Sequence, residues 1–302
     1  MSLSPHLRTT VLLSVLSLAM AVSVTAQIPE RDAAFIATAK NAASKYRSQA
    51  AAIADGFRPV GVEFPAMGEH WVSLQRVMAN TIDPELPSVL IYVTINGRPT
   101  LGGVGYTDLL RPGESLPQSP APSFWHEHNG SVAEESFPLR HQMGQESKPA
   151  DGNAVRLAVL HLWTEIPNDA GIFVADNWRL PLRRLGISSH LDANALQAIA
   201  LAQDESGYYA LMLRVALHPT DREEVAIDRV LADTRAAAIK QVALLRAAPS
   251  GRQPGTVNDK ALADVWESLW RSLADRLPSR RGQLSVLRME LESGSRAAGQ
   301  MR

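Results

Sequence analysis

The sequence predicts an α+β protein, with an antiparallel sheet and an N-terminal helix followed by a mainly helical C-terminal region. Three observations lead to this fold class. Asn96-Gly97 stands between two runs of apolar and β-branched residues, which is a strong signal for a β-hairpin. An Ala-rich helical pattern precedes the hairpin, and amphipathic helical patterns dominate after about residue 188. Hairpin-linked strands beside a helix favour an antiparallel sheet with a helix on one face.

The first 26 residues have the three parts of a secretory signal peptide. Arg8 precedes an apolar run over residues 11–24, and Val24-Thr25-Ala26 supplies small residues for cleavage before Gln27. The apolar run is shorter than the roughly 20 residues that cross a bilayer. We therefore expect a cleaved signal, a periplasmic or secreted protein, and no membrane span in the mature chain.

Residues 27–187 are predicted to form one α+β domain. Pro29 and the acidic residues after it start a helix at about residues 30–54, which Gly56 would end. Strands are expected at residues 88–95 and 100–109 around the hairpin turn, and at residues 68–74, 123–128, 155–164 and 170–175. Residues 111–152 contain six prolines and are predicted to be a long loop, a kind of segment that is more often functional than filler.

Residues 188–302 are predicted to be a helical region, either packed on the sheet or forming a separate bundle. Asp192 can cap one helix, and Thr220-Asp221-Arg222-Glu223 is a capping box that opens a second. A third helix follows residues 256–259, with Trp266 and Trp270 four residues apart on the face that we expect to be core.

The composition excludes several classes of site. The chain has no cysteine, which rules out disulfides, thiolate metal sites, iron–sulfur clusters and covalent haem attachment, so nitrogen, oxygen or thioether ligands would have to hold any metal. Lys and Arg number 30 against 31 Asp and Glu, without a dense basic run, so we expect no nucleic-acid partner. The signature motifs of serine hydrolases, nucleotide-binding proteins and standard zinc proteases are absent.

Histidines in aromatic surroundings are the strongest local signal. His126 and His128 are two residues apart on a predicted strand, so their imidazoles point to the same side and can bind one metal ion, while Glu127 faces the other way. His161 on another strand could supply a third imidazole, and His70 a fourth ligand. Three imidazoles with an oxygen ligand suit Zn(II), and imidazole-rich sites also suit Cu(II) and Ni(II).

Other residues could modify this site. Glu69 is an alternative oxygen ligand, and Met67, His141 and Met143 could add donors for copper. His190 and His218 adjoin helix ends and are expected to cap helices or face solvent.

Three functions follow from these residues. The leading one is a metal-binding protein with His70, His126, His128 and His161 as ligands. The second is a metal-dependent hydrolase in which Glu69 or Glu127 acts as the base. The third is a metal-free module that binds a small ligand or a protein partner, because a histidine among apolar residues is more often a hydrogen-bonded core residue than a ligand.

Residues 31–186 resemble a little-characterised group of exported bacterial proteins. The shared motifs read Gly68-Glu69-His70-Trp71, Gly103-Val104-Gly105-Tyr106, Leu160-His161-Leu162-Trp163 and Gly171-Ile172-Phe173. The resemblance implies an exported α+β domain with a histidine site and implies no particular reaction. It does not extend to the helical region.

Overall fold

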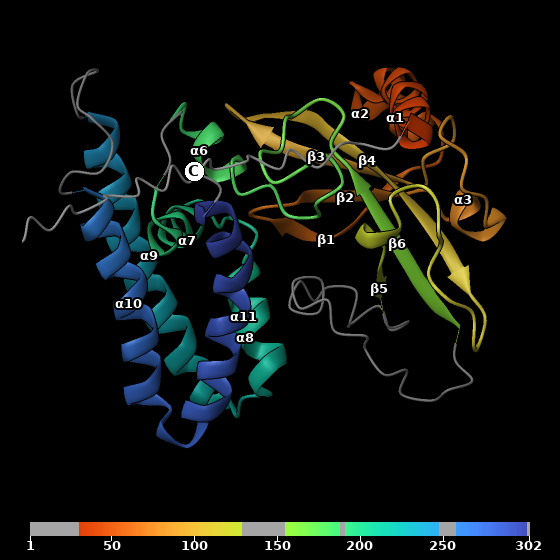
Figure 1. The fold of residues 1–302 in the computed structure, drawn as a ribbon. Coiled ribbons are helices and arrows are strands. Elements are labelled where there is room, and N and C mark those ends of the chain that lie inside the picture. The colour runs from red at the N-terminus through yellow and green to blue at the C-terminus, as the bar shows by residue number, and fades with distance from the viewer. Residues whose placement is uncertain (1–29, 129–154, 188–190, 248–257, 301–302) are drawn as a thin grey trace, which may run out of the picture.

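The protein is described here from a computed structural model, which covers residues 30–128, 155–187, 191–247 and 258–300. The predicted signal peptide, most of the long loop, and His141, Met143 and His190 lie outside the described residues. The described part has the predicted α+β architecture, with an antiparallel six-stranded sheet and a helical C-terminal region beside it (Figure 1). Within the described part, no helix is both long enough and apolar enough to span a membrane.

The N-terminal helix is broken into pieces, so the single helix expected over residues 30–54 is corrected. Helix α1 covers Glu30–Ala43, the 3₁₀ helix η1 covers Ser44–Tyr46, and α2 covers Gln49–Ala54. The break occurs where Ser48 takes an extended backbone and its hydroxyl accepts a hydrogen bond from the backbone N–H of Ala50 at 3.2 Å. A serine that caps a new helix in this way ends the preceding one.

The sheet has the strand order β1-β2-β3-β4-β6-β5, and all neighbours are antiparallel. Its strands are β1 (Arg58–Phe64), β2 (Gly68–Val72), β3 (Val89–Ile95), β4 (Arg98–Leu110), β5 (His126–His128) and β6 (Arg156–Leu162). Asn96 and Gly97 both have positive φ, at 52° and 71°, which is the backbone of a tight hairpin turn between β3 and β4. The hairpin prediction is therefore confirmed.

Three parts of the sheet differ from prediction. Strand β1 was not expected. Residues 170–175 form turns instead of a strand, because the Asn168 side chain accepts from the N–H of Ala170 and donates to the carbonyl of Val174, which holds the backbone in a local loop. The strand expected at 123–128 is shortened to His126–His128, because the 3₁₀ helix η2 (Pro122–Phe124) takes up its first residues. Helix α3 (Leu74–Ala79) follows β2.

The two faces of the sheet pack against different partners. On one face, apolar side chains of β3, β4 and β6 form a core with α1 and Trp125. On the other face, Ile91 and Val93 pack with Trp163, Ile166 and Leu180. Next to that smaller cluster, Phe64, Ala66 and Met67 belong to the core of the helical region, so the two halves share buried side chains.

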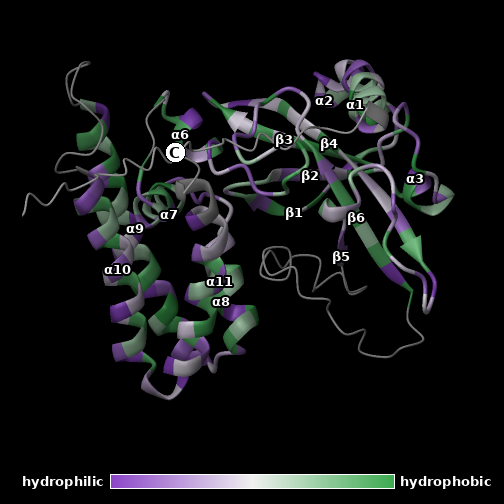
Figure 2. Ribbon diagram, in the orientation of Figure 1, coloured by the Kyte–Doolittle hydropathy of each residue, from purple (hydrophilic) through white to green (hydrophobic). Residues whose placement is uncertain are grey.

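The helical region consists of α6 (Leu180–Arg184), α7 (Ala193–Ala202), α8 (Tyr208–Leu217), α9 (Asp221–Ala247), α10 (Asn258–Arg276), η3 (Pro278–Arg280) and α11 (Arg281–Gln300). Asp192 caps α7 by accepting from the N–H of Asn194 at 2.9 Å. Thr220 and Glu223 form the reciprocal bonds of the predicted capping box. Hydrophobic and hydrophilic positions alternate along α9 and α10, whereas α7 is apolar over most of its length (Figure 2).

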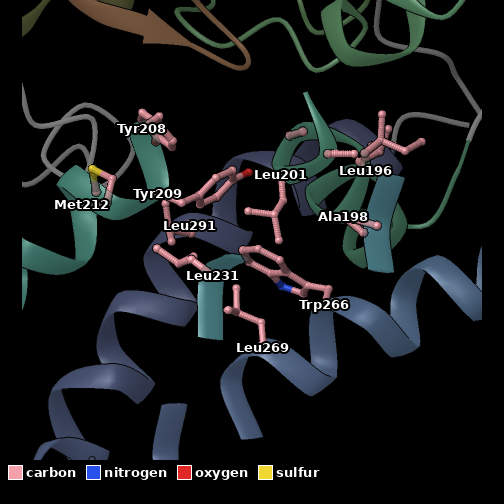
Figure 3. Close-up of a cluster of buried hydrophobic side chains, with 14 of the residues drawn as sticks. Leu196, Ala198, Leu201, Tyr208, Tyr209, Met212, Leu231, Trp266, Leu269 and Leu291 are labelled. Atoms are coloured by element: carbon pink, nitrogen blue, oxygen red, sulfur yellow. The ribbon is translucent and has the colours of Figure 1, made fainter. Parts of the chain in front are cut away.

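Trp266 is at the centre of this helical core, as the sequence predicts. Its indole lies between Leu201 and Leu269, with the Tyr209 ring beside it at a centroid distance of 5.7 Å (Figure 3). The indole N–H donates to Glu292, a fully buried carboxylate that also pairs with two arginines of its own helix. A buried, hydrogen-bonded charge of this kind favours one arrangement of α10 against α11.

Candidate metal centre

The strand register places His70 and His161 on the same face of the sheet. His70 on β2 pairs with Ile91 of β3, whose partner on β4 is Gly103. His161 on β6 pairs with Gly105, two residues further along β4. Paired residues and residues two apart share a face, so both imidazoles project from the face opposite to α1.

The sheet is strongly curled at this point. Strands β3 and β4 lie between β2 and β6, and a flat sheet would separate β2 from β6 by roughly 14 Å. The Nε2 atoms of His70 and His161 are nevertheless 3.3 Å apart. The histidines therefore meet across the concave side of a curled sheet.

Two glycines make this approach possible. Gly103 and Gly105 are the β4 residues on the concave face between the two histidines. A Cβ added at Gly103 would lie 2.5 Å from the carbonyl oxygen of Leu162, and one at Gly105 would lie 3.0 Å from Cβ of Val89. A side chain at either position would push β4 away from a neighbouring strand, so the two glycines allow the close strand packing on which the approach of the imidazoles depends.

His126 adds a third imidazole to the group. It pairs with Val159, two residues before His161 on β6, and the rings of His126 and His161 are 5.2 Å apart between centroids at an interplanar angle of 71°. Nδ1 of His126 is 3.4 Å from the carbonyl oxygen of Phe124. When Nδ1–H donates to this carbonyl, the buried Nε2 is the nitrogen with a lone pair, as metal-binding histidines require.

Burial favours the neutral form of these imidazoles. His161 is a buried residue, whereas His70 and His126 are half-buried. In each of the half-buried rings one nitrogen is nevertheless shielded from solvent, namely Nδ1 of His70 and Nε2 of His126. Desolvation lowers the pKa of His70 to about 4, with a further contribution from the charge of His126. Desolvation also lowers the pKa of His126 to about 4. Both rings are therefore neutral at pH 7, which is the state that binds a metal.

Aromatic rings connect the histidines to the helical region. The Phe64 ring lies edge-on to His70 at a centroid distance of 5.4 Å, and to Tyr208 of α8 at 5.6 Å. Phe64 and Tyr208 are both buried. A dry aromatic border of this kind limits access of water to one side of the group.

The two candidate carboxylates lie away from the imidazoles. Glu69 and Glu127 alternate with the histidines along β2 and β5, so they face the opposite side of the sheet. Glu69 accepts from the indole N–H of Trp71 at 2.6 Å, and Glu127 pairs with Arg156 at 2.5 Å. Neither the ligand role considered for Glu69 nor the base role considered for either residue finds support in these positions.

The backbone of His128 belongs to β5, but its side chain lies outside what the structure describes. Its Cα partner is Leu157, four residues from His161 along β6, which corresponds to roughly 13 Å along the strand. Among the described side chains, no group of three or more His, Asp or Glu is already arranged around a single metal position. The described centre is thus a close pair, His70 and His161, with the ring of His126 against it.

The remaining histidine and methionine candidates have structural positions. His218 is the left-handed C-cap of α8, with φ 43°, and Met67 is buried in the core that the helical region shares with β1 and β2. Sequence reasoning missed Phe64, because β1 was not predicted, and it missed the meaning of Gly103 and Gly105. Their Gly-x-Gly spacing, which puts both glycines on one face of a strand, could have indicated a close approach.

Three of the motifs that carry the resemblance to exported bacterial proteins lie on β2, β4 and β6, the strands that form this centre. No protein-family model, curated protein or solved structure matches the chain. Membership of that group therefore stays a prediction.

Proposed function

We propose that this is an exported, periplasmic or secreted metal-binding protein whose imidazole centre holds Zn(II) or Cu(II). The observation that carries the proposal is the 3.3 Å between the Nε2 atoms of His70 and His161. Two nitrogens bound at about 2.0–2.1 Å to one tetrahedral ion are about 3.3–3.4 Å apart. The pair therefore already has the spacing of two ligands of one ion, and His126 is the third ligand of the proposed site.

A hydrogen bond between two neutral imidazoles would give a similar distance, so the pair alone does not distinguish the two interpretations. Two further observations favour a metal. A third imidazole, His126, packs against His161, and a simple histidine pair in a core has no need of it. In addition, the pKa values of His70 and His126 are lowered to about 4, so metal binding at pH 7 would not compete with protons on these rings.

Metal content of the full chain, purified without a His tag, tests the proposal. After reconstitution with Zn(II) or Cu(II) and desalting, we expect about one equivalent of metal, and His161→Ala should retain less than about a tenth of an equivalent. His218→Asn is the matched control, because position 218 is at the opposite end of α8 from Tyr208 and asparagine tolerates its left-handed backbone. A wild-type protein that holds less than about a tenth of an equivalent would refute the proposal and favour a histidine hydrogen bond.

A further inference from the structure

We infer that a second site, in a cavity of about 580 Å³ between the sheet and the helical region, binds a small zwitterion with an apolar side chain, such as an apolar amino acid. The cavity is bounded by the end of β1, the β3–β4 turn, the ends of α6 and α7, and the last third of α9. Its volume is in the range of small-molecule sites, which often lie where two parts of a chain meet. The site is separate from the imidazole centre and does not depend on the function proposed for it.

One wall of the cavity is apolar. Helix α9 contributes Ile239, Val242 and Ala243. Ile239 is 46% exposed, which leaves a large aliphatic side chain open to the cavity. An aliphatic side chain of a ligand would remove this surface from water, and burial of apolar area is the main source of affinity for small ligands.

Some of the charged residues in the cavity are already used by the fold. One carboxylate oxygen of Glu63 accepts from Arg184 at 2.7 Å and from the N–H of Thr94 at 3.3 Å. Asp204 accepts from the N–H groups of Tyr208 and Tyr209 at 2.8 and 3.0 Å, which caps α8. The Glu63–Arg184 contact joins β1 to α6, whereas the Asp204 contacts lie within the helical region, and neither would change on binding.

Three other groups are available for a ligand. Glu205 and Arg246 are exposed and of opposite charge, and their side chains make no ion pair or hydrogen bond with any residue of the described part. Oε1 of Gln203 is buried and has no donor in that part, although its Nε2 donates to the carbonyl of Pro181 at 2.8 Å. Gln203 is also the C-cap of α7, and the negative end of a helix dipole favours a cation.

These groups match the three parts of an amino-acid zwitterion. The ammonium group would bind Glu205 and Gln203 at the end of α7, and the carboxylate would bind Arg246. The apolar side chain would lie against Ile239 and Ala243. A ligand that lacks either charge would leave one of these contacts unmade.

Calorimetric titration of the full chain with L-leucine tests the inference. We expect L-leucine to bind, and N-acetyl-L-leucine and L-leucinamide, which each lack one charge, to bind at least about tenfold more weakly. Leucyl-leucine is the second probe, and a higher affinity for it would identify a peptide end as the ligand. Chelator treatment should leave this binding unchanged, so failure here is distinguishable from failure of the metal site.

Two variants and one control locate the site. Ala243→Trp should fill the cavity and abolish binding, whereas Leu244→Trp, at the next residue, 51% exposed and outside the cavity lining, should retain it. Arg246→Glu changes an exposed residue, so it should fold and bind L-leucine at least about tenfold more weakly. The inference is overturned if neither probe binds at about 10 mM, or if binding is unchanged in Arg246→Glu and in folded Ala243→Trp.

Discussion

Replacing Gly103 by alanine should destabilise the sheet and weaken metal binding together. The added Cβ would lie 2.5 Å from the carbonyl oxygen of Leu162 and 3.1 Å from Cα of Trp163. Both are backbone atoms of β6 or the residue after it, so no side-chain rotation can relieve the clash. The β4 and β6 strands would have to separate, and this would move His161 relative to His70.

The size of the effect follows from this contact. Overpacking a well-packed interior costs about 1–3 kcal/mol. In a protein of this size each kcal/mol changes the Tm by about 2–4 °C, so the Tm of Gly103→Ala should fall by roughly 2–12 °C. A loss of about 1.4 kcal/mol in metal binding would raise the Kd for the metal about tenfold.

Circular dichroism melting and competition with a chromophoric chelator measure the two quantities. Gly282→Ala on α11 is the matched control, because a Cβ there would meet nothing within 4 Å. Alanine is also the better helix former, so the control should lose no stability. If the Tm of Gly103→Ala stays within about 1 °C of the wild type, the argument that a bare glycine face allows the curl is wrong.

Three further outcomes are expected. The free energy of unfolding, measured with urea, should fall as the pH drops from 6.5 toward 4. The unfolded chain binds protons at His70 and His126 near their ordinary pKa of 6.5, whereas the folded protein binds them only at about 4. A flat pH profile would contradict the lowered pKa values. Thr220→Ala should cost about 1 kcal/mol through loss of the capping box, measured by the same assay. Tyr209→Phe should cost about 1–3 kcal/mol, because the Tyr209 hydroxyl is the donor to buried Oε1 of Gln197, and an unchanged urea midpoint would count against that bond.

The features that the sequence predicted well are local. The Asn96-Gly97 turn, the Asp192 cap and the Thr220 capping box each depend on residues within a few positions of one another. Turns and helix caps can therefore be predicted from a short stretch of sequence. The antiparallel sheet followed from the same signals, because a tight hairpin requires antiparallel strands.

The features that the sequence did not predict depend on contacts between distant segments. Strand β1 contains Pro59 and a positive-φ Gly61, which obscure a strand pattern but are tolerated at the edge of a sheet. The 3.3 Å approach of His70 and His161 depends on strand order and curl, which no local pattern specifies. Successive side chains of a strand point to opposite faces, and this rule placed Glu127 on the other face from His126 and His128. The same rule applied to β2 would have excluded Glu69 as a ligand beside His70.

The ring of Phe64 has a practical consequence for cutting the chain. This one side chain touches His70 on the sheet and Tyr208 on α8, and it is buried with Ala66 and Met67 among residues of the helices. A fragment that stops at residue 187 would lack Tyr208 and would expose part of the Phe64 ring directly beside His70. Metal binding measured on such a truncated protein would concern an altered imidazole centre. A failure of that fragment to bind metal would therefore say little about the intact molecule.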